Sequence, residues 1–129
     1  MMSLMIVEDN EPMRRMIRSM VADLAGRIDE CGDGAEAYAC YADRRPDWVL
    51  MDIAMPGLDG ITATRQIISA FPDARVLIVT DYDDAELRAK AQEAGACGYL
   101  IKENLLDLRR LLEATGLTQP LATAEPEGG

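Results

Sequence analysis

Four short apolar runs, each too short for a helix, constrain the fold of this chain more than any other feature. They lie at residues 4–7, 48–51, 76–79 and 99–101 and are rich in Val, Ile and Leu. Continuous apolar runs of this length are typical of strands that are buried on both faces of a sheet. A fifth segment, residues 27–31, alternates apolar and polar side chains, which predicts an edge strand exposed on one side.

Segments with helical periodicity separate these predicted strands. The clearest covers residues 13–24, where apolar side chains recur every three or four positions between a candidate N-cap, Asn10, and a candidate C-terminal stop, Gly26. Further helices are expected at residues 35–44, 60–71, 84–94 and 105–115, and Leu87 is the only large aliphatic residue of the helix at 84–94. Five strand and helix units predict an α/β fold in which helices cover both faces of a parallel sheet.

Size and composition limit the classes of protein that fit. The 129 residues suffice for one domain, expected at residues 1–115, and the tail at residues 116–129 lacks periodicity and is expected to be flexible. A net charge of −10 disfavours binding to nucleic acid phosphates. The apolar runs are too short to span a membrane, and three cysteines without close pairing suit a reducing compartment, so we expect a cytoplasmic protein.

Residues with reactive or charged side chains stand at the carboxyl ends of four predicted strands. Glu8 and Asp9 follow the first strand, and Asp52 follows the run at residues 48–51. Thr80 and Lys102 occupy the corresponding places after the runs at residues 76–79 and 99–101. Ligands of open parallel sheets bind at this edge, so we expect these five residues to form one site.

The acidic residues of this predicted site indicate a metal ion. Three neighbouring carboxylates repel one another unless a cation neutralises them, so Glu8, Asp9 and Asp52 predict a divalent metal. All-oxygen ligands favour a hard ion such as Mg²⁺. Asp52 would then be a nucleophile toward a phosphoryl group, with Lys102 and the Thr80 hydroxyl holding its oxygens.

Taken singly, these residues also have structural interpretations. Asp9 suits a turn or cap, Asp52 suits a contact with loop backbone, and Lys102 suits a surface position. Their joint placement favours a function. The acidic residues at positions 81, 83 and 84 lack the spacing of a calcium loop and indicate a helix start.

The segment at residues 51–60, MDIAMPGLDG, closely resembles the receiver domain of bacterial two-component response regulators. The resemblance covers roughly residues 3–113 and continues through the acidic pair, the turn at residues 32–37, Thr80, the helix end at residues 93–96 and the segment at residues 99–102. The stretches at residues 80–84 and 102–105 resemble receivers that are joined to LuxR-type helix-turn-helix domains. We expect this chain to lack that output domain.

This resemblance implies a flavodoxin-like doubly wound sandwich with strand order 2-1-3-4-5, and a signalling domain rather than an enzyme, which promotes only its own phosphorylation and dephosphorylation. A sensor histidine kinase or phosphotransfer protein would deliver a phosphoryl group from phosphohistidine to Asp52. Mg²⁺, with Mn²⁺ as an alternative, would be bound by Glu8, Asp9, Asp52 and the main-chain carbonyl of Ala54. Thr80 and Tyr99 match the switch pair of the family.

The same resemblance implies an output through protein contacts. The helix at residues 84–94 has a poor apolar stripe, which predicts low local stability and suits an element that moves. The face made by this helix, the strand at residues 99–101 and the helix at residues 105–115 would bind a downstream protein or a second copy of the chain. Direct nucleic acid binding and membrane binding are not expected.

Two residues depart from the pattern of many receivers, and two other functions must be weighed. Asp81 stands where a small residue is common and adds negative charge near an anion site. Glu103 replaces a proline after Lys102, which leaves open whether the peptide bond there is cis. A phosphatase similar to haloacid dehalogenases would need a second Asp where Ala54 stands. A receiver that signals without phosphate would not need the complete set of site residues, and the presence of all five in this sequence argues against that alternative.

Overall fold

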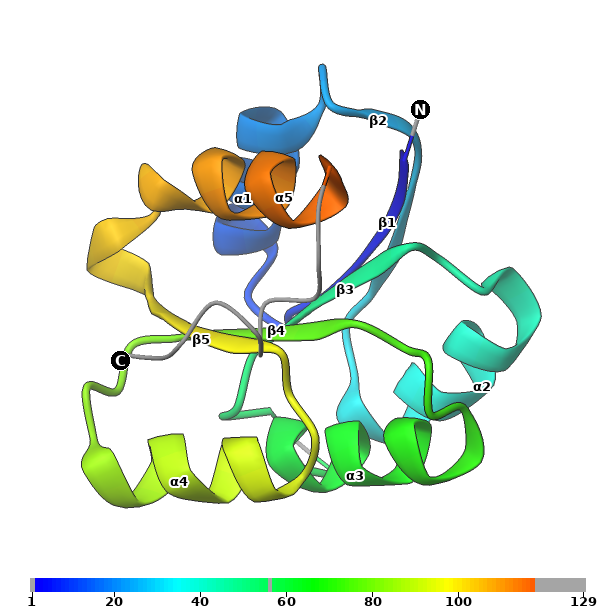
Figure 1. Ribbon diagram of the computed structural model, residues 1–129, viewed down its shortest axis with the longest axis vertical. Coiled ribbons are helices and arrows are strands. Elements are labelled where there is room, and N and C mark those ends of the chain that lie inside the picture. Colours follow the sequence, from blue (N-terminus) through cyan, green and yellow to red (C-terminus); the bar gives the residue numbers. More distant parts are fainter. Residues whose placement is uncertain (1, 56, 118–129) are drawn as a thin grey trace.

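The structure is a computed structural model that describes residues 2–55 and 57–117. Five parallel strands form one sheet in the order β2-β1-β3-β4-β5 (Figure 1). They are β1 (Met2–Val7), β2 (Ala25–Cys31), β3 (Trp48–Met51), β4 (Val76–Thr80) and β5 (Gly98–Ile101). All five strands lie where the sequence predicts them, and β2, the alternating segment, lies at an edge. The expected doubly wound fold is confirmed.

Helices cover both faces of this sheet (Figure 1). Helices α1 (Glu11–Val21) and α5 (Asp107–Leu117) lie on one face, and α2 (Gly34–Arg44), α3 (Gly60–Ala70) and α4 (Ala85–Glu93) lie on the other. Alternate strand residues therefore enter different cores: Leu50 packs with the α1 and α5 side, whereas Val49 and Met51 pack with the opposite side. This double burial explains why β3 is a continuous apolar run.

Side-chain caps fix where four of the helices begin. Asn10 accepts a hydrogen bond from the Met13 N–H at the start of α1, as predicted. Asp33 and Asp59 cap α2 and α3. Asp84 accepts from the Leu87 N–H, which confirms that this part of the acidic cluster marks a helix start.

The prediction that Gly26 ends the first helix is wrong. Helix α1 ends at Val21, and Gly26 lies inside β2, which pairs with β1 from Ala25 onward. Leu24 continues the helical spacing but packs against the core from the connecting turn. Pairing with β1 draws the backbone at Ala25 and Gly26 into the sheet, whereas helical periodicity alone predicts the end of a helix there.

The last two helices differ in how they are held. Helix α4 buries only Ala91, with Leu87 partly buried, which agrees with its weak apolar stripe. A short 3₁₀ turn, η1 (Lys102–Asn104), joins β5 to α5. Helix α5 runs to Leu117, two residues into the predicted tail, and residues 118–129 of that tail lie outside the described residues.

The cysteines and the lengths of the helices agree with the expectations drawn from composition. All three cysteines are free thiols, as their spacing predicts. None of the helices in the described part of the chain has the length and apolar content needed to cross a bilayer.

Candidate functional site

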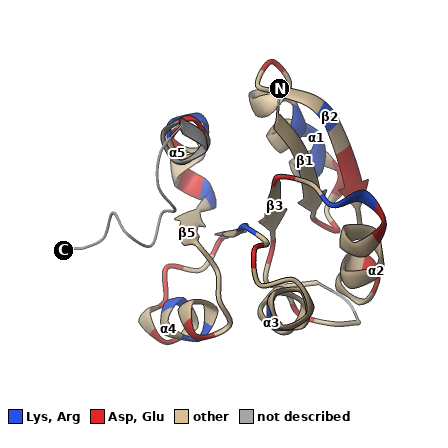
Figure 2. Cartoon of the chain, turned by 45° about the vertical axis from the view of Figure 1, so that its right-hand side comes forward, with Lys and Arg blue, Asp and Glu red and all other residues tan. Residues whose placement is uncertain are grey.

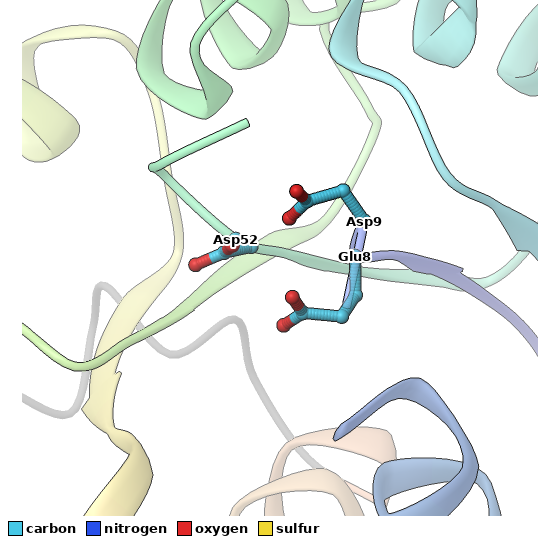
Figure 3. A group of neighbouring side chains, drawn as sticks. All are labelled: Glu8, Asp9 and Asp52. Carbon is cyan, nitrogen blue, oxygen red and sulfur yellow. The ribbon is translucent and has the colours of Figure 1, made fainter. Parts of the chain in front are cut away.

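Three carboxylates meet where β1 and β3 end. Glu8 and Asp9 follow β1, and Asp52 follows β3, which is the neighbour of β1 in the sheet. Each offers one oxygen atom that lies within 4.8 Å of the other two. Figure 3 shows the three side chains directed to the same side of the sheet edge. Adjacent parallel strands thus bring together residues that are more than forty positions apart.

Two of these carboxylates are shielded from water. Glu8 is 2% exposed and Asp52 is 5% exposed, whereas Asp9 is exposed. Burial raises the pKa of Asp52 to about 6, the negative charge of Glu8 adds to this effect, and the positive charge of Lys102 opposes it. A second positive charge at the site would therefore stabilise the ionised form of Asp52.

Lys102 is the nearest cation. Its Nζ lies 2.8 Å from Glu8 Oε1 and 3.4 Å from Asp52 Oδ1. Burial acts against the charged form of Lys102, but the contacts with Glu8 and Asp52 outweigh it and raise the pKa of the ammonium. One lysine leaves the three carboxylates with excess negative charge. Glu8 Oε1 meets Lys102 as an ion pair and accepts no well-aligned hydrogen bond from the described residues.

An open cavity of about 280 Å³ lies over these groups. Its walls are formed by Glu8, Asp9, Asn10, Met13, Asp52, Ala54, Asp81, Tyr82 and Lys102. Met13 and Tyr82 were not predicted as site residues, because an apolar helix residue and an aromatic loop residue carry no chemical signature of a site. Asp81 lines the cavity, so its negative charge lies near the predicted phosphoryl site, as the resemblance to receiver domains implies.

The loop after Asp52 is folded back by a close approach of two backbone segments. A Cβ atom on Gly60 would lie 1.8 Å from the Asp52 carbonyl oxygen, so only glycine fits there. The Gly60 N–H donates to the Ile53 carbonyl at 2.9 Å, and Thr64 Oγ1 donates to the Gly60 carbonyl at 2.7 Å. These contacts set the position of Ala54 at the cavity wall.

Thr80 and Tyr99, the predicted switch pair, both contact Tyr82 and not each other's polar atoms. Thr80 is fully buried, and its hydroxyl accepts a hydrogen bond of 3.3 Å from the Tyr82 N–H. The Tyr99 hydroxyl donates to the Tyr82 carbonyl at 2.7 Å, and the Arg88 guanidinium lies 4.5 Å from the centre of the Tyr99 ring. The loop between β4 and α4 therefore connects the two predicted switch residues.

The departure at Glu103 has a plain structural outcome. The described peptide bonds are all trans, including the bond between Lys102 and Glu103. This agrees with the cost of a cis bond before a residue other than proline, about 2.5–4 kcal/mol. Lys102 begins the turn η1 and still reaches both buried carboxylates.

The chain combines a doubly wound α/β sheet with paired acidic residues, an aspartate and a lysine at its carboxyl edge, and this combination is typical of a class of signalling domains. Residues 4–115 match the response regulator receiver domain family. The chain belongs to this family, the receiver domains of two-component response regulators, which are signalling domains rather than catalytic enzymes.

Similar proteins include LuxR-family regulators, in agreement with the resemblance seen in the sequence. The transcriptional regulatory protein YhcZ of Bacillus subtilis is 36% identical over 104 residues, which are 79% of this chain and 49% of that protein. A two-component response regulator of the LuxR family from Aurantimonas sp. SI85-9A1 is 35% identical, with a TM-score of 0.82 over 94% of this chain and 85% of the other.

A third similar chain comes from a complex whose composition is informative. It belongs to the CheX-CheY-BeF3-Mg complex of Borrelia burgdorferi, is 25% identical, and has a TM-score of 0.80 over 88% of each chain. The chain described here spans about half the length of the curated relatives it matches.

Proposed function

We propose that Asp52 accepts a phosphoryl group from a phosphohistidine on a sensor histidine kinase or phosphotransfer protein. The observation that supports this role is the position of its carboxylate, which is buried at the end of β3, beside Glu8 and Asp9, and 3.4 Å from the Lys102 ammonium. The cavity above it is open to solvent-borne donors. A buried acid without a ligand role would be expected to have hydrogen-bond partners instead of two acidic neighbours.

In the proposed step, an Asp52 carboxylate oxygen forms a bond to phosphorus as the bond between phosphorus and the donor imidazole nitrogen breaks. The electron pair of that bond returns to the imidazole. Lys102 is placed to hold one phosphoryl oxygen, and Thr80 would exchange its contact with the Tyr82 N–H for another. Positioning and charge neutralisation account for most catalysis in phosphoryl transfer.

We propose that Glu8, Asp9, Asp52 and the main-chain carbonyl of Ala54 hold Mg²⁺, which Mn²⁺ can replace. The excess negative charge and the oxygen-only donors suit a hard divalent cation. When bound, such a cation neutralises the carboxylates and the incoming phosphoryl oxygens. The Mg and beryllofluoride in the CheX-CheY complex support this proposal by similarity.

The acceptor role is tested with acetyl phosphate and Mg²⁺, followed by intact mass measurement. The parent protein should gain one phosphoryl group, and Asp52→Asn or the parent in EDTA should gain none. Asp47→Asn is a matched control, because Asp47 bonds Ser3 at the opposite end of the sheet. Equal phosphorylation of Asp52→Asn and the parent would exclude Asp52 as the acceptor.

We further propose that phosphorylation shifts α4 and its flanking loops, so that the face formed by α4, β5 and α5 binds a downstream protein or a second copy. Support comes from the small buried surface of α4 and from two contacts with the loop before this helix, the pairing of Arg88 with Asp83 and the hydrogen bond from Tyr99 to the Tyr82 carbonyl. We place this function in the cytoplasm, where sensor kinases act. Light scattering with and without Mg²⁺ and beryllofluoride tests self-association, and an unchanged mass would leave a separate protein as the partner.

A further inference from the structure

Arg14, on the first turns of α1, contacts the backbone of the predicted metal site from outside the cavity. Its Nη1 donates to the main-chain carbonyl of Glu8 at 2.8 Å. Its Nε donates to Glu30 Oε1 at 2.8 Å, on the edge strand β2. The Arg14 side chain is only 20% exposed, so these contacts are partly shielded from water.

The edge strand thus supports the site although it supplies no residue to the cavity. Figure 2 shows basic residues of α1 beside acidic residues of β2. Glu30 is shared, because Arg18 pairs with its other oxygen, Oε2. The two arginines hold the Glu30 carboxylate, and Glu30 in turn fixes the plane of the Arg14 guanidinium.

Hydrogen bonds hold both backbone polar groups of Glu8, which belong to two successive peptide units. The Glu8 N–H donates to the Cys31 carbonyl at 2.9 Å, and the Glu8 carbonyl accepts from Arg14. The Glu8 carbonyl is the first half of the peptide that leads to Asp9, so its orientation sets the direction in which the Asp9 side chain leaves the backbone. Rotation of this peptide would move the Asp9 carboxylate relative to Asp52.

We propose that Arg14 is a positioning residue for the divalent cation: its two-pronged contact with the Glu8 carbonyl and Glu30 holds Glu8 and Asp9 in the geometry that binds the ion. This inference rests on the proposed metal site. Lysine cannot replace Arg14 in this role, because a single ammonium lacks the planar fork that meets both oxygens at once.

A role of Arg14 through its charge and a role through positioning predict opposite changes in Mg²⁺ affinity when Arg14 is replaced by glutamine. A cation close to the site repels Mg²⁺, so if Arg14 acted only through its charge, Arg14→Gln would tighten Mg²⁺ binding. A positioning role predicts weaker binding for both Arg14→Gln and Arg14→Lys. Partners that orient metal ligands typically change metal affinity by about 10-fold or more.

The experiment measures the Mg²⁺ dissociation constant of the whole chain by calorimetry, well below the unfolding temperature of each variant. Arg14→Lys should weaken binding about 10-fold. Arg18→Gln is the matched control, since Arg18 shares Glu30 but is not in contact with Glu8, and its dissociation constant should change less than about 2-fold. If Arg14→Lys does not fold, Glu30→Gln should weaken binding by more than the Arg18→Gln control does, because it loosens Arg14 without removing it.

A second readout does not depend on the metal. In EDTA, the Glu8 amide, which donates to the Cys31 carbonyl, should exchange its hydrogen about 5-fold or more faster in Arg14→Lys than in the parent, because Glu8 loses the contact that holds its carbonyl and the backbone there opens more readily. The Val49 amide, which donates to the Arg75 carbonyl in the middle of the sheet, should not change. A merely structural role would accelerate both amides together.

The results separate this inference from the proposed function. If the parent binds Mg²⁺ and Asp52→Asn does not, but Arg14→Lys binds as tightly as the parent, the role of Arg14 is overturned and the metal site stands. If Arg14→Gln binds more tightly than the parent, Arg14 acts through charge and the positioning role is wrong. If the parent binds no Mg²⁺, the metal site and this inference fall together.

Discussion

Asp52 lies beside a second buried carboxylate, and the Lys102 ammonium offsets the unfavourable effect of burial and repulsion only in part. Burial and the charge of Glu8 raise its pKa to about 6, so its ionised form costs stability at neutral pH. A residue selected for stability alone would not be an acid in this place. Such a loss of stability is expected at a residue that accepts a phosphoryl group beside a metal ion, because functional sites often hold ionisable groups with shifted pKa values.

The first prediction concerns this cost at Asp52. In EDTA at pH 7, Asp52→Asn should raise the free energy of unfolding by about 1–3 kcal/mol, because it removes one buried charge and its repulsion by Glu8. Urea denaturation measures the change. Asp9→Asn, which neutralises an exposed carboxylate at the same site, should have a smaller effect. A variant less stable than the parent would show that Lys102 already compensates the charge of Asp52.

At the scale of single elements, the caps and contacts of α3 and α4 hold the loops that border the site. Asp59 caps the start of α3 and accepts hydrogen bonds from the N–H groups of Ile61 and Thr62 at 2.9 and 3.0 Å. Partial burial opposes its ionised form, but these bonds outweigh burial and lower its pKa. The cap therefore also fixes the end of the loop that starts at Asp52.

The second prediction follows from this cap. Asp59→Ala should lower the free energy of unfolding by about 1 kcal/mol at pH 7. Because the pKa of Asp59 is lower in the folded than in the unfolded state, the ionic part of its contribution is complete above about pH 4 and is lost as the pH falls through the folded-state pKa. Denaturation of parent and variant at pH 7 and near pH 3 should show a smaller difference in acid. A difference that does not shrink would exclude a charged cap.

The third prediction concerns Arg88, whose guanidinium lies over the Tyr99 ring and pairs with Asp83. A cation–π contact at an exposed site contributes about 0.5–1 kcal/mol. Arg88→Gln should therefore raise hydrogen exchange rates within α4 about 2- to 5-fold while α1 is unchanged. The control Lys90→Gln removes an exposed pair with Glu86 on the same helix and should have less effect. Equal effects would assign no special role to the ring contact.

At the scale of the whole molecule, a net charge of −10 makes cations generally stabilising. The fourth prediction is that Mg²⁺ raises the unfolding temperature more than NaCl of equal ionic strength. At a free concentration ten times the dissociation constant, binding adds about 1.4 kcal/mol, which corresponds to a shift of several degrees. In Asp52→Asn the two salts should act alike. A Mg²⁺ advantage that persists in this variant would place the ion elsewhere.

Much of the fold was predictable because its signals are local. The apolar run at residues 48–51 is too short for a helix and suits a buried strand, and the caps Asn10 and Asp84 each bind an N–H three residues further on. The meeting of the acidic residues at the carboxyl edge was predictable for the same reason, since Glu8 and Asp52 directly follow strands and Asp9 is the next residue after Glu8. Gly26 was misjudged because the pairing of β2 with β1 is not visible in helical periodicity.

The residues themselves therefore determine the class of fold, the strands, most helix starts and the set of polar groups at one edge of the sheet. Their relative geometry is decided only by tertiary structure. The contacts of Arg14 with the Glu8 carbonyl and Glu30, the approach of Gly60 to the Asp52 carbonyl, and the link from Tyr99 to Tyr82 all join separate elements. Such contacts depend on how helices pack on the sheet, and a linear pattern contains no distance between residues far apart in the chain.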